Sequence, residues 1–205
     1  MSPAQTLQQR LAEARGARRI EMVVIGGSAG GVDALVGLLP TLPVNFGPAV
    51  ACILHVPADR ESRLAELFAA RTLLPVREAQ DKEPIQPGTV YFAGSGYHLS
   101  VEQDRSFSLS CEPPVQYARP AIDILMESAA DVYGPALAGI LLTGANYDGA
   151  DGMCRIRERG GLTIVQDPEE AQASTMPEEA IRRCAPHLVL PLSAIRTVLP
   201  LLETP

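Results

Sequence analysis

The chain has 205 residues, of which 46% are hydrophobic, no tryptophan and a formal net charge of −7. This length supports one domain with a complete apolar core, and the acidic charge argues against a nucleic-acid partner. No apolar stretch reaches the roughly 18 residues of a membrane span, and the polar N-terminal segment shows no signal peptide, so we expect a cytoplasmic protein without membrane insertion.

Apolar and amphipathic segments alternate along the chain. Residues 4–17 have helical periodicity and are expected to form a polar helix or the remnant of a linker, so residues 1–19 are set apart from one domain over residues 20–205. Strands are predicted over residues 21–26, 49–56, 76–79, 89–93, 97–101, 106–111, 138–143, 162–166 and 187–190. Helices are predicted over residues 31–39, 60–72, 120–133, 149–159, 176–184 and 192–202.

The order of these segments predicts the fold class. Strands such as 49–56 are apolar throughout, which is typical of parallel strands covered on both faces. Their alternation with helices predicts an α/β protein with a doubly wound, mostly parallel sheet, a Rossmann-like three-layer sandwich. The strands at 89–93, 97–101 and 106–111 follow one another without a helix, so we expect a short antiparallel insertion there.

The turn after the first strand reads Gly-Gly-Ser-Ala-Gly over residues 26–30 and leads directly into a helix. This is the G-x-S-x-G pattern of a nucleophile elbow, which exposes a serine hydroxyl at the end of a sheet, so Ser28 is the candidate nucleophile. Glycine-rich turns also hold phosphates or are purely structural. However, Ser28 stands where a dinucleotide fingerprint has its second glycine, and no lysine follows Gly31 as a P-loop requires.

A serine hydroxyl needs a base to become a nucleophile, and the chain has three histidines. His55 ends the second apolar strand, and the carboxyl ends of parallel strands meet at the edge of the sheet where Ser28 also lies. The alternative for His55 is a histidine that merely packs against the end of its strand. His98 is expected to be an exposed strand residue, and His187 is expected at the opposite edge of the sheet.

The acid that orients the histidine should also follow a strand. Asp148 comes after the apolar strand 138–143 and is the best candidate, whereas Asp33, Asp123 and Asp167 are weaker ones. The alternative for Asp148 is the N-cap of helix 149–159. A rival triad with His187 in place of His55 is rejected, because only one strand precedes Ser28 and an α/β-hydrolase needs more.

The four cysteines, Cys52, Cys111, Cys154 and Cys184, contain no C-x-x-C pair. We expect them to be reduced core thiols that form neither a metal site nor a disulfide. The sequence gives no sign of a cofactor.

Many ordered segments of the chain resemble the catalytic domain of the chemotaxis receptor protein-glutamate methylesterases, the CheB type. The resemblance runs from about residue 20 to about residue 200. The segments that carry it are residues 25–31, 55–57, 86–91, 96–99, 113–115, 119–123, 142–153, 163–167 and 176–181.

The resemblance implies a serine hydrolase that removes methyl esters from glutamate side chains of chemoreceptors and, in many members, deamidates receptor glutamines. It places the catalytic triad at Ser28, His55 and Asp148, which agrees with the choice made from the residues, and it implies the same fold. It implies methylated receptor helices as partners and, in addition, a cognate methyltransferase or a separate response regulator.

Other residues are candidates for the oxyanion site and for substrate contact. Backbone amides around the elbow or after strand 138–143 would hold the oxyanion. An acidic protein that acts on glutamate-rich helices also needs a positive rim, for which Arg60, Arg63 and Arg119 are candidates. The candidates nearest the reacting atoms are Ala29, Gly30, Ala145, Asn146 and Arg119.

The chain departs from the family pattern near the site. Ala29 stands where the family usually has threonine, Ala145 where it has methionine, and Leu54 where it has glutamine. These changes motivate an alternative, a catalytically weak or inactive module that binds receptors or signalling proteins. The receiver domain that precedes the family's catalytic domain is also missing from this sequence, so we expect either a single-domain relative or a piece of a longer chain.

Overall fold

The computed structural model describes residues 6–55 and 62–203 of the chain. Seven strands form one sheet in the order β3-β4-β2-β1-β7-β8-β9, and all neighbouring strands are parallel. Their bounds are β1 (Met22–Gly27), β2 (Ala49–Leu54), β3 (Val76–Glu78), β4 (Val90–Phe92), β7 (Leu137–Leu141), β8 (Leu162–Gln166) and β9 (Leu188–Leu190). The doubly wound parallel sheet is therefore confirmed.

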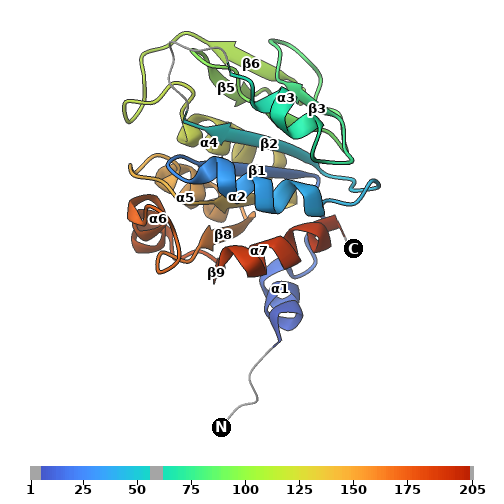
Figure 1. Cartoon of the computed structure of the whole chain (residues 1–205), viewed down its shortest axis with the longest axis vertical. Helices are drawn as coiled ribbons and strands as arrows, with labels where there is room; N and C mark the ends of the chain where they lie inside the picture. Colours follow the sequence, from blue (N-terminus) through green and yellow to red (C-terminus); the bar gives the residue numbers. More distant parts are fainter. Residues whose placement is uncertain (1–5, 56–61, 204–205) are drawn as a thin grey trace.

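Helices cover both faces of this sheet and make it the middle of three layers (Figure 1). One face packs against α1 (Leu7–Arg15), α2 (Gly31–Leu38), α3 (Leu64–Ala69) and α7 (Leu192–Val198). The other packs against α4 (Ile122–Tyr133), α5 (Ala150–Glu158) and α6 (Thr175–Cys184). Short 3₁₀ helices follow at η1 (Leu39–Thr41), η2 (Gly134–Ala136) and η3 (Leu199–Glu203).

The antiparallel insertion is smaller than the sequence indicated. Among the strands of the described residues, only β5 (His98–Val101) and β6 (Phe107–Ser110) pair antiparallel. The segment expected at 89–93 is β4, which joins the main sheet between β2 and β3. The reason is burial, because all three residues of β4 are covered on both faces, as in an interior parallel strand.

Other boundaries shift slightly. The second strand ends at Leu54, and the start of the helix predicted over 60–72 lies outside the described residues, which show α3 from Leu64. The helix predicted over 192–202 is α7 followed by η3. None of the helices in the described ranges combines the length and apolar character that a bilayer crossing requires.

The prediction of four reduced cysteines was wrong for one pair. Cys154 of α5 and Cys184 of α6 form a disulfide, with their Cα atoms 4.8 Å apart. The two helices pack side by side, and this contact brings together cysteines that are 30 positions apart in sequence. Cys52 is buried and free, and burial raises the pKa of its thiol, whereas Cys111 is exposed.

The strand order brings three loops together. β1 lies between β2 and β7, so the chain leaves β1 toward one side of the sheet and later returns to its other side at β7. The carboxyl ends of such neighbouring strands border the crevice in which α/β proteins bind ligands. The loops after β1, β2 and β7 carry Ser28, His55 and Asp148 respectively.

Candidate active site

Ser28 stands on a sharp turn between β1 and α2. Its N–H donates to the Thr143 carbonyl at 2.9 Å, and its carbonyl accepts from the Gly31 N–H at 2.8 Å, which closes the turn. Gly30 has a φ of +82°, and a Cβ atom there would lie 2.5 Å from Oε1 of Gln172. A side chain at position 30 would therefore both strain the backbone and clash, so the turn requires glycine.

His55 directly follows β2, next to the serine. Gly27 and Leu54 are register partners, so Ser28 and His55 are the first residues beyond paired strand ends, and the His55 N–H donates to the Gly27 carbonyl at 3.3 Å. The Nε2 atom of His55 lies 2.7 Å from Oδ2 of Asp148, and the imidazole is 14% exposed. His55 is therefore one half of a hydrogen-bonded histidine–aspartate dyad and more than a packed histidine.

The dyad defines which ring nitrogen is free. A carboxylate only accepts hydrogen bonds, so Nε2 of His55 carries the proton toward Asp148 and Nδ1 has the free lone pair. Nδ2 of Asn146 lies 3.5 Å from that Nδ1. Within residues 6–55 and 62–203 the Ser28 hydroxyl makes no hydrogen bond to His55, so the structure joins two of the three predicted triad residues and places the third at the adjacent strand end.

Asp148 is completely buried and is held by backbone donors of another helix. Its Oδ2 accepts from the Ile122 N–H at 2.7 Å and its Oδ1 from the Asp123 N–H at 2.9 Å. These two N–H groups belong to the first turn of α4, where unpaired amides favour an anion. The N-cap alternative was thus correct in kind but named the wrong helix, because Asp148 caps α4 and also orients His55.

The oxyanion candidates lie on two facing loops. Ala29 and Ala145 are exposed, and their N–H groups donate to no acceptor among the described residues. The Thr143 hydroxyl donates to the Ala29 carbonyl at 2.8 Å and accepts from the Ala173 N–H at 2.9 Å. Sequence reasoning missed this role of Thr143, which ties the serine turn to β7 and to the loop before α6.

Asn146 and Arg119 form hydrogen bonds within the loops that carry them. Oδ1 of Asn146 accepts from the Asp148 N–H at 3.3 Å. Nη1 of Arg119 donates to the carbonyls of Cys111 and Glu112, at 3.0 and 3.1 Å. Arg119 therefore holds the loop before α4 together, and the structure does not bring it to the Ser28–His55–Asp148 group.

The other two histidines are structural. His98 was expected to be exposed, but it is buried where β5 packs on α4, and its Nδ1 accepts from the Ala121 N–H at 3.2 Å. His187 accepts from Thr163 at the start of β8, and burial, aided by Arg157 and Arg18, lowers its pKa. This position agrees with the rejection of His187 as the base.

One buried acid beside the site was undervalued. Asp123 was only a weaker candidate from the sequence, yet its Oδ1 accepts from the N–H groups of Gly149 and Gly152 at 2.9 and 2.7 Å. Its place in the first turn of a helix was the available signal. Among the described residues no group of three or more histidine, cysteine or acidic side chains is arranged to hold a metal ion.

The chain matches one family of known proteins along most of its length. The family model described as CheB methylesterase matches residues 23–199. A Leptospira interrogans protein, named provisionally as a protein-glutamate methylesterase/protein-glutamine glutaminase, is 42% identical over 175 residues, which cover 85% of this chain and 91% of that protein. The protein-glutamate methylesterase FrzG of Myxococcus xanthus is 38% identical over 191 residues, which cover 93% of this chain and 57% of that protein.

The fold of the chain also matches this family. The crystal structure of the Thermotoga maritima CheB methylesterase catalytic domain superposes with a TM-score of 0.84 at 32% identity, covering 89% of this chain and 98% of that one. The chain spans about half the length of several other relatives, 53% for proteins from Pseudomonas savastanoi and Carboxydothermus hydrogenoformans. On sequence and on structure alike, this chain is a member of the CheB methylesterase family.

Proposed function

We propose that the protein is a serine esterase that hydrolyses methyl esters of glutamate side chains in chemoreceptors and also deamidates glutamine. The observation that carries this proposal is the 2.7 Å contact between His55 Nε2 and the buried Asp148. His55 and Ser28 directly follow the paired strand ends Leu54 and Gly27. This arrangement supplies a nucleophile, a base and an orienting acid. The matched relatives are named for the same two activities.

In the proposed mechanism Nδ1 of His55 takes the proton of the Ser28 hydroxyl while Oγ attacks the ester carbonyl carbon. The carbonyl π electrons move to oxygen, and the N–H groups of Ala29 and Ala145 donate to this oxyanion. When the carbonyl re-forms, the C–OCH₃ bond breaks and His55 returns the proton to the leaving oxygen, which departs as methanol. Water then attacks the acyl-enzyme by the same route and releases the glutamate acid and free Ser28.

Asp148 keeps the His55 ring in one orientation throughout this cycle. It accepts from Nε2–H throughout and stabilises the imidazolium that forms when Nδ1 takes the proton. The ring nitrogens have the reverse roles of the serine-protease template, in which Nδ1 faces the acid. In enzymes without bound substrate, the hydrogen bond between nucleophile and base is often long and tightens only when substrate binds, which fits the absence of a Ser28–His55 hydrogen bond among the described residues.

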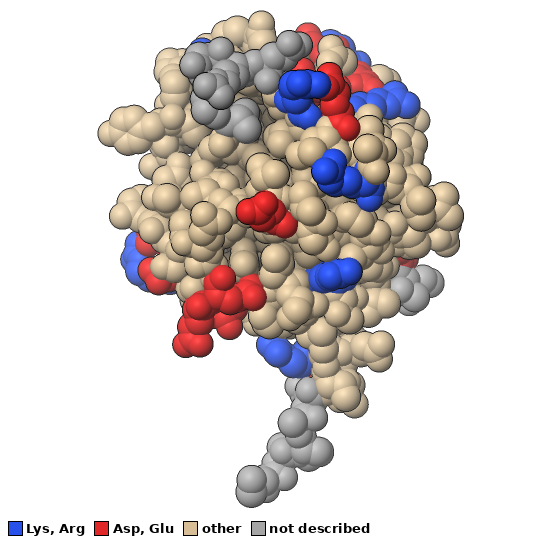
Figure 2. Space-filling view, in the orientation of Figure 1, with Lys and Arg blue, Asp and Glu red and all other residues tan. Residues whose placement is uncertain are grey.

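The expected positive rim is not what surrounds the site. Arg63 pairs with Glu66, Arg119 is occupied by loop carbonyls, and Arg60 lies outside the described residues. On the face shown in Figure 2, the basic side chains lie apart from one another and form no basic patch, whereas several acidic ones gather at the lower left. We therefore propose that substrate recognition depends on uncharged groups more than on arginines.

Two exposed tyrosines lie on the loops of the site. Tyr147 lies next to Asn146 and is half exposed. Tyr117 is fully exposed at the tip of a two-residue turn, where it and Gln116 have φ values of +64° and +48°. The Gln116 carbonyl lies 3.5 Å from Nδ2 of Asn146, which also faces His55. A strained turn that displays an aromatic ring beside a reactive group is typical of a recognition surface.

Methanol release tests the proposal. The wild-type protein is incubated with a receptor carrying labelled glutamate methyl esters, and Ser28→Ala serves as the control. The proposal predicts methanol from the wild type and none above background from the variant. A wild type that binds the receptor without releasing methanol would favour the alternative of a non-catalytic module, which the altered flanks Ala29 and Ala145 motivate.

A further inference from the structure

The N-termini of α4 and α5, which lie beside the site, are capped reciprocally by two aspartates: Asp148, just before α5, and Asp123, in the first turn of α4. The Asp148 carboxylate accepts from the first turn of α4, and the Asp123 carboxylate accepts from the N–H groups of Gly149 and Gly152 at the start of α5. Asp148 is fully buried and Asp123 is 5% exposed. Each acid thus fixes the backbone that carries the other.

The glycines make this exchange possible. Gly149 has a φ of +96°, and a Cβ atom at Gly152 would lie 3.3 Å from both Cα and Oδ1 of Asp123. The absence of side chains lets the start of α5 close on the Asp123 carboxylate. The same turn sets the direction of Asp148, one residue before Gly149.

The two carboxyl groups also interact directly. The pKa of Asp123 is raised to about 7, first because burial disfavours its charge and then because Asp148 and Asp151 repel it. An interaction with the Asp148 side chain raises that pKa further. The hydrogen bond from the Gly152 N–H acts in the opposite direction.

Among the described residues Asp123 pairs with no cationic side chain, and Asp148 and Asp151 from the α5 side both raise its pKa. Arg155 of α5 pairs instead with Asp131, farther along α4. His98 of β5 accepts from the Ala121 N–H just before α4, and Glu127 is the next acid along α4 itself. β1 and β7, which also pack on α4, contain no titratable residue. Protonation is therefore the way in which this site tolerates a second buried carboxyl group.

We propose that Asp123 is a positioning residue, which fixes the Asp148 carboxylate against His55 through the reciprocal helix caps. The inference rests on the proposed function for its kinetic consequence. When Asp123 ionises, two buried carboxylates lie close together and the orientation of Asp148 is disturbed. Ester hydrolysis therefore falls as the pH rises through the range in which Asp123 ionises.

Two substitutions separate the cap from the charge. Asp123→Asn keeps an oxygen for the Gly149 and Gly152 N–H groups, but it cannot ionise. Asp123→Ala removes the cap as well. Asp33→Asn is the matched control, because Asp33 is an exposed acid in the first turn of the neighbouring helix α2.

The experiment measures kcat and KM for ester hydrolysis from pH 5.5 to 9. We expect Asp123→Ala to lower kcat at least tenfold with little change in KM, Asp123→Asn to retain kcat at neutral pH but lose the alkaline fall, and Asp33→Asn to match the wild type. Asp123→Asn also keeps the proposal testable if the alanine variant does not fold. A wild-type alkaline limb in Asp123→Asn, or a wild-type kcat in Asp123→Ala, would overturn the proposal.

A second measurement tests the position of Asp148 without any ester hydrolysis. The proton on Nε2 of His55 is followed by NMR in the resting protein, in which Asp123→Ala is expected to shift or broaden this signal and Asp33→Asn is not. An unchanged signal in Asp123→Ala contradicts the positioning role. If the wild type shows this coupling but hydrolyses no ester, the proposed function fails and the positioning of Asp148 by Asp123 stands.

Discussion

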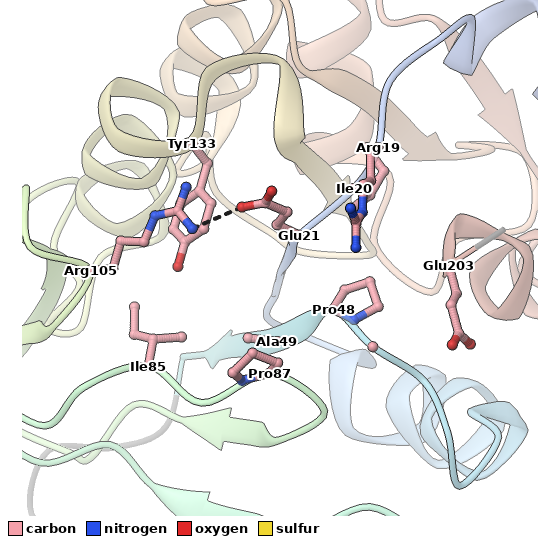
Figure 3. A pocket seen from close by; sticks show the side chains of 11 residues that line it. Arg19, Ile20, Glu21, Pro48, Ala49, Ile85, Pro87, Arg105, Tyr133 and Glu203 are labelled. Atoms are coloured by element: carbon pink, nitrogen blue, oxygen red, sulfur yellow. Dashed lines mark hydrogen bonds and ion pairs between the residues drawn. The ribbon is translucent and has the colours of Figure 1, made fainter. Parts of the chain in front are cut away.

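The two ends of the central sheet differ in where they hold charge. At the amino ends of β1 and β2 lies a hollow of about 830 Å³, whose walls include Arg19, Glu21, Arg105 and Tyr133 (Figure 3). Arg105 pairs there with Glu21 at 2.8 Å and lies over the Tyr133 ring, 4.8 Å from its centre. Both partners of this ion pair are about half exposed, so their charges are neutralised in contact with water.

The carboxyl ends have the opposite character. Asp148 and Asp123 are buried and accept from backbone N–H groups, and Asp148 contacts His55. Burying a carboxyl group is costly unless a fixed set of donors compensates it. A large cavity with an exposed ion pair is therefore weaker evidence of a reactive site than a small group of buried acids with matched donors.

The largest effect is expected from Ser28→Ala. Loss of the nucleophile should reduce ester hydrolysis by about 10⁴-fold or more, because the remaining groups cannot form the acyl-enzyme. Thermal unfolding should change little, since the serine side chain makes no hydrogen bond among the described residues. Turnover within tenfold of the wild type would contradict the assignment of the carboxyl end as the active end.

Asp148→Ala should damage both activity and stability. It leaves His55 without its acid and two buried N–H groups of α4 without an acceptor. We expect a loss of about 10³-fold or more in kcat and of about 3 kcal/mol in the free energy of unfolding. Steady-state kinetics and urea titration measure the two losses, and a loss of activity without any loss of stability would show that the α4 cap is unimportant.

Asp123→Asn should change how stability depends on pH. In the folded protein the pKa of Asp123 is raised from the ordinary 3.8 to about 7. Protonated Asp123 therefore contributes to the free energy of unfolding fully below pH 4, and this contribution is lost as the pH rises to about 7. At about 1.4 kcal/mol per pKa unit the shift corresponds to about 4 kcal/mol, which the asparagine variant should not lose. Urea titrations of both proteins at pH 4.5 and 7.5 measure how much the free energy of unfolding falls between the two pH values. An equal fall in the wild type and the variant would contradict a raised pKa of Asp123.

Thr143→Val should have a smaller effect. The substitution keeps the shape of the side chain but removes the hydroxyl that joins the Ala29 carbonyl to the Ala173 N–H. We expect about 1–3 kcal/mol lower stability and a looser serine turn, with kcat reduced more than KM is raised. A variant as active and as stable as the wild type would mean that the turn holds its shape without this tie.

Arg105→Ala, at the opposite end of the sheet, should have the smallest effect. Its ion pair with Glu21 is exposed, and such pairs contribute about 0–1 kcal/mol. Ester hydrolysis should stay within twofold of the wild type. A large loss of activity would place chemistry at the amino end and reverse the comparison.

Part of this site was predictable from local sequence. Ser28, His55 and Asp148 each follow an apolar run that forms a strand, and the alternation of strands and helices predicted that such ends meet. The reciprocal caps were not predictable, because the donors are backbone N–H groups from segments more than 20 residues away, and a backbone amide leaves no mark in the sequence. The same limit applies to the Cys154–Cys184 disulfide and to buried His98, which depend on how helices pack.

The most direct test of the central claim is to react the resting protein with a fluorophosphonate and map the adduct by mass spectrometry. Activation of Ser28 by the His55–Asp148 pair predicts a single adduct on Ser28, which His55→Ala and Asp148→Ala greatly slow and Arg105→Ala does not. An unlabelled Ser28, or labelling that is indifferent to His55, would contradict the claim that these three residues form one catalytic unit.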